Sequence, residues 1–272
     1  MSLQHAYAVT NRLTGLAAGS FAWSATATNP LHANDGKMDK LCTIASTATS
    51  VNVIIDLGAA YSISAVACLN HNLAGLATLK VEHATNLAFT TGVTEAKAAS
   101  TLGTSPAPLK DAVLQFAAVT KRYWRLTWTW TGSVAMSVGE LFFAESTALT
   151  RAEVYGHGGA RKYINSKFDG YTGEQRGHYI AGPIASRRLP FEALTESERN
   201  ELWAMYHAAR GGAVSLLWCE QYEAVATAAA AAYQACLFGK LTEDETSWTE
   251  DDFGVYGVSA LMLRSLAREV GS

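Results

Sequence analysis

The chain contains 272 residues, of which 49% are hydrophobic and 17% charged, and its formal net charge is −3. This length allows two ordinary domains or one large β domain. The charge argues against a nucleic-acid-binding surface, which needs a basic patch, because basic residues gather only in short pairs such as Arg161-Lys162 and Arg187-Arg188. We interpret these pairs as solvated strand ends. The charged fraction lies below the typical value of about 25%, which favours surfaces that meet other subunits, although an Ala- and Thr-rich chain would give the same result.

Neither secretion nor membrane insertion is indicated by the sequence. The first residues lack a basic segment followed by an apolar one, so we expect no signal peptide. No run of about 18 apolar residues occurs, so we expect no transmembrane helix. The four cysteines (Cys42, Cys68, Cys219 and Cys236) form no CxxC pair, which argues against a zinc ribbon or a thioredoxin-like site. Cys68 and Cys236 are predicted to be small buried hydrophobes.

The segment HANDGKMD, residues 32–39, places His32, Asp35 and Asp39 in one loop. Oxygen-rich loops can bind Ca²⁺. The spacing lacks the alternating carboxylates and the closing Glu of such a loop, so a turn at Asn34-Asp35-Gly36 is the favoured interpretation. His32 and Asp35 remain candidate ligand or interface contacts.

The first half of the chain is predicted to be β throughout. Alternating apolar and polar residues between turn signals predict strands at 50–58, 61–71, 77–85, 122–130 and 137–146. In the second of these runs, Ile63, Ala65, Ala67 and Leu69 are expected on one face. Short strands separated by turns are typical of a sandwich or jelly roll.

Three tryptophans, Trp124, Trp128 and Trp130, lie on one face of the fourth predicted strand. Such a row can stack on sugar rings. It can equally belong to the core or to a subunit contact, where aromatic residues are enriched. We favour core or interface and keep the three residues as candidate contacts.

Around residues 145–160 the pattern changes, and three glycines occur within four residues (Gly156, Gly158 and Gly159). We therefore predict a boundary at 147–158, with one domain over 1–148 and a second over 149–272. The second domain is predicted to contain a strand ending at Leu194, then one helix, then three strands at 213–220, 233–241 and 256–269. An Ala-rich stretch (223–233) is open to helix or loop, and an acidic stretch (242–254) is predicted to be a solvated loop.

The helix is the best-marked element of the sequence. Thr195 is a good N-cap and Glu198 completes a capping box. Arg210 is expected in the last turn and Gly211, followed by Gly212, in the C′ position. One apolar stripe is formed by Leu202, Met205, Tyr206 and Ala209. These features predict an amphipathic helix over about 196–210 that lies across a sheet.

No motif for a nucleophile, a zinc protease or a nucleotide loop occurs. His207 is the one candidate catalyst on the helix, and a single helical His is usually a surface residue. We therefore predict a protein that is not an enzyme and needs no cofactor or metal.

The segments LPFEALTESERNELWAMYHAARGGAVSLLWCEQY, YQACLFGKL and YGVSALMLRSLAREV resemble, in that order, the distal tail or tail-tip minor tail proteins of lambda-like long-tailed phages. The resemblance covers about residues 150–270, and Trp218 follows the strand after the Gly turn as in that family. It implies an α+β, tail-tube-like sandwich with one flanking helix. The Ala-rich stretch and the acidic stretch depart from the pattern.

The first half is similar to the galactose-binding-like (discoidin, F5/8-type C) jelly roll, over about residues 15–146. Asp56-Leu57-Gly58, Arg122-Tyr123-Trp124-Arg125 and Glu140-Leu141 match its motifs in order. That fold binds glycans, lipids or proteins in different members, so it implies no single ligand.

Together the two resemblances imply a structural virion protein. It would form a ring, of six copies by family resemblance, that joins the tail tube to the baseplate of a phage tail tip. Its partners would be itself, the tail tube, tape-measure and baseplate hub or fibre proteins, and the jelly roll would dock proteins or contact a cell-surface glycan. The alternatives are a non-catalytic carbohydrate-binding protein for host adhesion and, less favoured, an enzyme with an accessory binding module.

Overall fold

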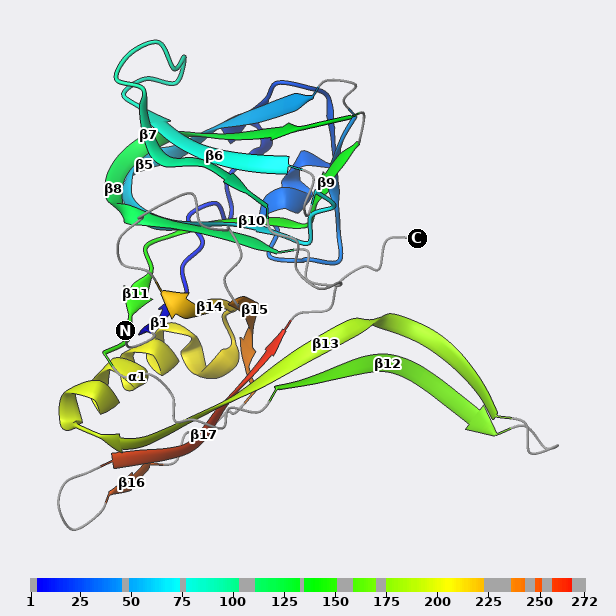
Figure 1. Cartoon of the computed structure of the whole chain (residues 1–272), viewed down its shortest axis with the longest axis vertical. Coiled ribbons are helices and arrows are strands. Elements are labelled where there is room, and N and C mark those ends of the chain that lie inside the picture. Colours follow the sequence, from blue (N-terminus) through cyan, green and yellow to red (C-terminus); the bar gives the residue numbers. More distant parts are fainter. Residues whose placement is uncertain are drawn as a thin grey trace. The chain divides into compact units, whose positions relative to one another are not determined.

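The computed structural model describes residues 4–45, 49–73, 77–102, 111–132, 135–150, 159–169, 175–222, 236–242, 248–250 and 256–265 (Figure 1). Over these residues the protein is mainly β, with several antiparallel sheets and one α-helix, which confirms the predicted fold class. The chain divides into two compact units, residues 1–148 with 219–236 and residues 149–218 with 237–272. No helix among the described residues has the length and apolar character that crossing a membrane requires.

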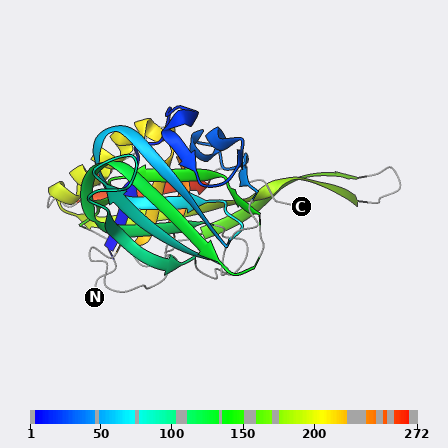
Figure 2. The same ribbon diagram turned by 90° about the horizontal axis from the view of Figure 1, so that it is seen from above.

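The first unit is a jelly-roll sandwich whose two layers share two long strands. These strands, β5 (Ser50–Leu69) and β8 (Ala112–Trp130), bend together and pass from one layer into the other (Figures 1 and 2). Their neighbours in one layer are β2 (Phe21–Trp23), β6 (Ala77–Ala84) and β7 (Thr94–Thr101), and in the other layer β10 (Glu140–Ala144).

Shorter elements complete the first unit. A three-stranded sheet contains β3 (Ala27–Thr28), β4 (Cys42–Ile44) and β9 (Met136–Val138). A further pair joins β1 (Gln4–Ala8) to β11 (Thr147–Ala148), and the short 3₁₀ helices are η1 (Ala18–Ser20) and η2 (Pro30–Asn34).

The core of the sandwich consists of alternate residues from the facing layers. On β8 the buried positions include Trp124, Leu126, Trp128 and Trp130, and on β5 they include Val51, Val53 and Ile55. This alternation follows from the two-residue period of a strand, which points every second side chain to the same face. The inward residues exclude water and supply most of the stabilising apolar burial.

The prediction that Ile63, Ala65, Ala67 and Leu69 share one face of their strand was wrong. Ile63 lies in the core with Val66 and Cys68, whereas Ala65 and Ala67 are buried outside that cluster. The change of face coincides with an irregularity in the β5–β8 register between Ile63 and Ala65, where two residues of β5 lie opposite four residues of β8.

The predicted strands exist, but with other boundaries. The runs 50–58 and 61–71 form the single strand β5, and the run 122–130 is the last part of β8. The run 137–146 is divided at Gly139 into β9 and β10. A Cβ at Gly139 would lie 2.9 Å from the Met38 carbonyl oxygen, so this close approach of two chain segments needs glycine.

The second unit contains a sheet with one helix. Its strands in spatial order are β14 (Leu216–Tyr222), β15 (Cys236–Leu241), β17 (Tyr256–Ser265), β13 (Gln175–Leu194) and β12 (Gly159–Asp169), with β16 (Trp248–Glu250) beside β17. The β13–β17 register shifts between Leu189 and Phe191, on either side of Pro190. Proline cannot donate to a sheet, so it occupies such irregular positions.

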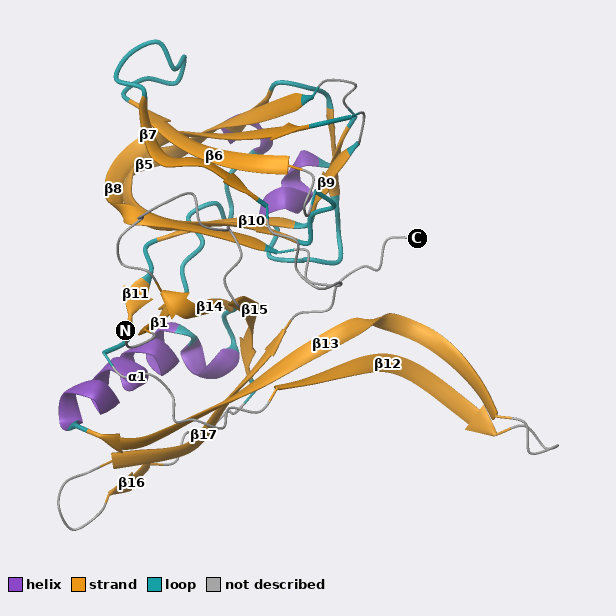
Figure 3. Ribbon diagram, in the orientation of Figure 1, coloured by secondary structure: helices purple, strands orange, loops and turns teal. Residues whose placement is uncertain are grey.

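The predicted helix is α1 (Glu196–Ala208), coloured purple in Figure 3. Its capping box is confirmed, since the Thr195 hydroxyl accepts from the Glu198 N–H at 3.3 Å and the Glu198 carboxylate accepts from the Thr195 N–H at 2.8 Å. Leu202, Met205 and Ala209 are buried, and Tyr206 is half-buried. The apolar stripe therefore faces the core of this unit, which also contains Leu189, Phe191, Leu216, Trp218, Leu261 and Leu263.

The helix ends at Ala208, two positions before the predicted end at about 210. Ala209 is the C-cap, and Arg210 at C′ has a φ of 49°, so a non-glycine residue takes the left-handed position expected for Gly211. Gly211 and Gly212 follow with φ of 60° and 93° in η3 (Arg210–Gly212). Three successive left-handed residues reverse the chain toward β14.

Two loop predictions have different outcomes. The acidic stretch 242–254 is not wholly a loop, because Trp248–Glu250 form β16 and pair with Tyr256–Val258 of β17. The aromatic Trp248 and the β-branched Thr249 favour a strand, and their pairing with β17 outweighs the effect of the surrounding charged residues. The Ala-rich stretch 223–233 lies outside the described residues.

Candidate functional site

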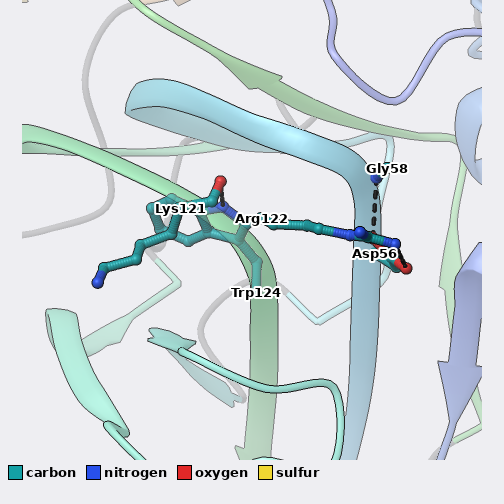
Figure 4. Close-up of polar contacts among 5 residues, drawn as sticks. All are labelled: Asp56, Gly58, Lys121, Arg122 and Trp124. Atoms are coloured by element: carbon teal, nitrogen blue, oxygen red, sulfur yellow. Dashed lines mark hydrogen bonds and ion pairs between the residues drawn. The ribbon is translucent and has the colours of Figure 1, made fainter.

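Two of the motifs that resemble the galactose-binding-like family, Asp56-Leu57-Gly58 and Arg122-Tyr123-Trp124-Arg125, meet where β5 and β8 bend (Figure 4). The Asp56 carboxylate accepts from Nε of Arg122 at 2.6 Å and from its terminal Nη2 at 2.8 Å, and it also accepts from the Gly58 N–H at 2.8 Å. The bidentate guanidinium lowers the pKa of Asp56, which partial burial opposes and the Gly58 N–H reinforces.

This arrangement holds the bend of the sandwich. Gly58 has a φ of 77°, and the β5–β8 register is interrupted between Asp56 and Tyr61, where β5 leaves one layer for the other. Beside it, the Trp124 indole N–H donates to the Lys121 carbonyl at 3.1 Å. The Asp-Leu-Gly and Arg-Tyr-Trp-Arg motifs therefore have structural roles: Arg122 pairs with Asp56, and Arg125 pairs with Glu82 at 2.9 Å.

The three candidate tryptophans lie in the core. Trp124 and Trp128 are fully buried and Trp130 is 3% exposed. Trp124 packs edge-on against His83 and Phe143, and Trp128 stacks on Trp23 with ring centroids 6.1 Å apart. A ring enclosed in this way offers no face to a ligand, so the structure places the row in the core rather than in a binding surface.

The loop that contains His32 and Asp35 adopts the predicted turn. The Asp35 side chain accepts from the Lys37 N–H at 2.9 Å, and Gly36 has a φ of 74°. His32 lies in η2, with its Nδ1 3.2 Å from the Leu41 carbonyl oxygen. Asp35 is exposed and His32 half-buried. No group of three potential metal-ligating side chains occurs in the part of the chain that the structure describes.

A buried carboxyl group anchors this loop to the sandwich. Glu140, fully buried at the start of β10, accepts from the Asn11 side-chain amide at 2.8 Å and from the Gly36 N–H at 3.0 Å. Asn34, also buried, donates to the carbonyl oxygens of Leu13 and Leu16 at 2.9 and 3.1 Å. The loop is therefore positioned by buried polar groups, an arrangement that the Glu-Leu motif alone did not reveal.

Burial raises the pKa of Glu140 to about 9, which the neighbouring negative charge of Asp35 reinforces and the hydrogen bonds from Gly36 and Asn11 oppose. The ordinary pKa of a glutamate in an unfolded chain is 4.5. Between these two values the folded protein binds a proton that the unfolded chain does not. The contribution of Glu140 to the free energy of unfolding is therefore largest below pH 4.5 and falls as the pH rises toward 9.

Replacing Glu140 by glutamine should remove this pH dependence, because the amide keeps the shape of the protonated group and does not ionise. The free energy of unfolding of the native chain should decline relative to that of Glu140→Gln by up to about 1.4 kcal/mol per pH unit between the two pKa values. Urea unfolding at pH 5, 6.5 and 8 measures the difference. Parallel pH profiles of the two proteins would contradict the assignment.

In the second unit, the outer face of α1 carries an aromatic group that sequence reasoning missed. Trp203 is 41% exposed, stacks on Tyr206 with centroids 6.0 Å apart, and meets His207 edge-on at 4.9 Å. The spacing of three and four residues could have revealed it. His207, the only candidate catalyst of the helix, is thus packed against a tryptophan.

The remaining signature residues of the second unit are structural. Trp218 is fully buried, and a Cβ on Gly212 would lie 2.1 Å from the Leu241 carbonyl oxygen. Glu201 of α1 accepts from both the N–H and the hydroxyl of Thr150, at 2.9 and 2.7 Å. Cys42, Cys68 and Cys219 are buried. The predicted burial of Cys68 is confirmed, whereas the side chain of Cys236 lies outside the described residues.

The most extended feature of the second unit is the antiparallel ribbon of β12 and β13 (Figures 1 and 2). Residues Gln175–Arg187 of β13 pair with Gly159–Asp169 of β12, whereas β17 pairs only with Ser186–Leu194. Over most of its length the described ribbon is therefore two strands wide. Such a ribbon leaves backbone donors and acceptors on both edges without a partner strand.

The fold and these sites define a jelly-roll sandwich joined to a second, ribbon-bearing β unit. Neither a protein-family model nor a curated protein matches the chain. Among solved structures it is similar to chitosan-binding module 1 of a Paenibacillus sp. IK-5 chitosanase/glucanase, at 17% identity over 50% of this chain and 99% of that chain, with a TM-score of 0.41. It is also similar to a CBM32 module of a Clostridium perfringens family 31 glycoside hydrolase (21% identity, 47% and 93% covered, TM-score 0.38). A third is the lectin domain of lectinolysin (16%, 51% and 98%, TM-score 0.39).

Proposed function

We propose that the protein is a structural subunit of a phage tail tip, in which the second unit assembles into a ring and the jelly roll docks other virion components. The observation that carries the proposal is the two-stranded ribbon of β12 and β13. A two-stranded ribbon is at best marginally stable by itself in water, because it buries little apolar surface and leaves both edges open. A neighbouring chain that covers or pairs with the ribbon removes both penalties.

The order of elements in the second unit agrees with this proposal. Strand β13, the capped helix α1, the turn at Gly211-Gly212 and strand β14 follow one another as in the distal tail proteins that the sequence resembles. In this unit Thr195 and Glu198 cap the helix, and Trp218 is fully buried. A ring subunit needs such a rigid frame and no reactive group.

Mass measurement and negative-stain class averages of the purified chain test the proposal. We expect a closed ring, of six copies by family resemblance, either alone or when the chain is co-expressed with the products of neighbouring genes. A tape-measure gene immediately upstream would support the tail assignment independently. A chain that stays monomeric under all these conditions would rule the ring out.

The second candidate function is glycan binding by the jelly roll, and the observation that favours it is the anchored loop of residues 29–41. Its backbone is held by the buried Glu140 and Asn34, while Leu31, Asp35 and Lys37 are exposed. Polar groups held in fixed positions are what sugar recognition requires. The loop therefore offers a preformed surface on which a sugar could be bound.

A polysaccharide array tests this second function. Retention that is lost in Asp35→Ala and Lys37→Ala and kept in Thr129→Ala, an exposed change on β8 of the same sandwich, would support it. A uniformly negative array would leave protein docking as the role of the jelly roll.

A further inference from the structure

Three aromatic rings form one cluster on the outer face of α1. Trp203 and Tyr206 lie nearly parallel, with ring centroids 6.0 Å apart and an interplanar angle of 26°. The His207 ring stands edge-on to both, with its centroid 4.9 Å from that of Trp203 and 6.5 Å from that of Tyr206. Side chains three and four positions apart are neighbours on a helix, so the three rings hold each other in one arrangement. A ligand that binds them would not have to order them first.

The cluster is exposed to solvent. Trp203 is 41% exposed, His207 is exposed and Tyr206 is half-buried. The neighbouring exposed side chains, Ala204 and Ala208, are too small to cover the rings. The other phenylalanine, tyrosine and tryptophan side chains that the structure describes are buried or half-buried. A single exposed apolar side chain is common on any surface, but an exposed tryptophan held among other rings is typical of a binding site.

The cluster has no charged neighbour on its own stretch of helix. Residues 202–209 contain no Asp, Glu, Lys or Arg. In the turns before them, Arg199 lies 3.6 Å from Glu196, and Glu201 accepts two hydrogen bonds from Thr150. The surface is therefore apolar, with polar atoms at the edges of the rings, and it favours an uncharged ligand over an ionic one.

The size of the exposed surface favours a small ligand over a protein partner. A tryptophan side chain has roughly 250 Å² of surface, so the exposed fraction of Trp203 leaves about 100 Å². A stable protein interface needs about 800 Å² from each partner. One sugar ring, which has an apolar face and hydroxyl groups around its rim, matches a surface of this size and chemistry.

We propose that Trp203, Tyr206 and His207 form a binding site for a pyranose ring of a glycan. The C–H bonds on one face of the sugar, polarised by the neighbouring oxygens, pack on the electron-rich face of the indole. Sugar hydroxyl groups at the rim bond to His207, whose ring nitrogens are not hydrogen-bonded to any other described residue. The site belongs to the second unit and depends neither on ring assembly nor on the loop of residues 29–41.

Saturation-transfer NMR of the full chain tests the site, with the methyl β-pyranosides of glucose, galactose and N-acetylglucosamine as probes. We expect at least one of them to bind with a Kd of about 1–10 mM, the range for a ligand of this size that contacts one surface. Trp203→Ala should weaken binding at least about tenfold, and Trp203→Phe, which keeps a ring face, should weaken it less. Sorbitol has the hydroxyl groups of glucose without a rigid ring face and should not bind.

Leu87→Ala is the matched control variant. Leu87 is 50% exposed in the loop between β6 and β7, so the change removes exposed apolar surface without removing a ring. This variant should bind the sugars as the native chain does. Both Leu87→Ala and Trp203→Ala alter exposed side chains, so their melting curves should match that of the native chain and exclude unfolding as the cause of lost binding.

The remaining outcomes overturn the site. Absence of binding up to about 100 mM, or equal binding by the native chain and Trp203→Ala, excludes it. Binding that is lost in Asp35→Ala and kept in Trp203→Ala assigns the sugar to the jelly roll. Without sugar binding, loss of ring assembly in Trp203→Ala identifies a protein contact, and loss of binding to phosphatidylcholine vesicles identifies a lipid surface.

The same measurements separate this inference from the proposed function. A chain that binds sugar through Trp203 and stays monomeric keeps the site and rules out the ring. A chain that forms the ring and binds no sugar keeps the proposed function and rules out the site.

Discussion

Replacing Gly212 by alanine is expected to destabilise the second unit by about 3 kcal/mol or more. Two penalties add at this position. Gly212 has a φ of 93°, a conformation that strains any residue with a Cβ, and the added Cβ would lie 2.1 Å from the Leu241 carbonyl oxygen. That oxygen belongs to the backbone of β15 and cannot move without disturbing the sheet. Calorimetry measures the loss, and hydrogen exchange should place it in α1 and β15.

Gly132→Ala is the matched control for this prediction. Gly132 has a similar φ of 90°, but an added Cβ would meet nothing within 4 Å. We therefore expect only the backbone strain, about 1–2 kcal/mol. The difference between the two variants isolates the clash with β15. A Gly212→Ala protein that loses no more stability than Gly132→Ala would show that the turn and β15 do not approach as described.

Replacing Asn11 by alanine is expected to cost the jelly roll about 3 kcal/mol. The Asn11 amide donates to Glu140 at 2.8 Å and to the Leu141 carbonyl at 2.9 Å, and its oxygen accepts from the N–H groups of Leu13 and Phe143 at 3.1 and 3.0 Å. The change removes four hydrogen bonds and leaves buried polar groups of β10 without a partner. Buried groups left in this state lose their full hydration, which is why the cost exceeds that of one surface hydrogen bond.

Asn86→Ala provides the comparison for Asn11. Its side chain makes three hydrogen bonds, to the Thr90 hydroxyl and from the N–H groups of Thr90 and Thr91, but these lie in an exposed loop. Water replaces the lost partners there, so we expect a change of about 0.5 kcal/mol. Urea unfolding of both variants measures the two losses of stability. Equal losses would mean that Asn11 holds only local loop structure and does not tie the N-terminal segment to β10.

The Asn11 and Glu140 results also bear on the candidate binding loop. Glu140 holds residues 29–41 directly, because it accepts from the Gly36 N–H. Asn11 holds them indirectly, because it donates to Glu140. If the loop contacts a glycan or a protein, Asn11→Ala should weaken binding without removing any contacting group. Asn11→Ala would weaken binding by altering the position of the loop, whereas Asp35→Ala would remove a contacting side chain.

Local chemistry explains which features the sequence determined by itself. The β class, the capped helix after Thr195 and the turn at Asp35-Gly36 all follow from patterns within a few residues: side-chain alternation, a capping box and an Asx-Gly turn. Short-range interactions of this kind act in the same way in any fold. The sequence alone therefore suffices to predict these elements.

Other features depend on partners far away in the sequence, and only the tertiary structure decided them. The register shift after Ile63 exchanged the two faces of β5, and Asp56 met Arg122 across 66 positions. The burial of Trp124 in the core depended on the second layer that covers it. The segments Arg161-Lys162 and Arg187-Arg188, which are far apart in the sequence, lie on adjacent strands because β12 and β13 pair in this register. Strand pairing and burial are set by the free energy of the whole assembly of strands, and no local pattern contains that information.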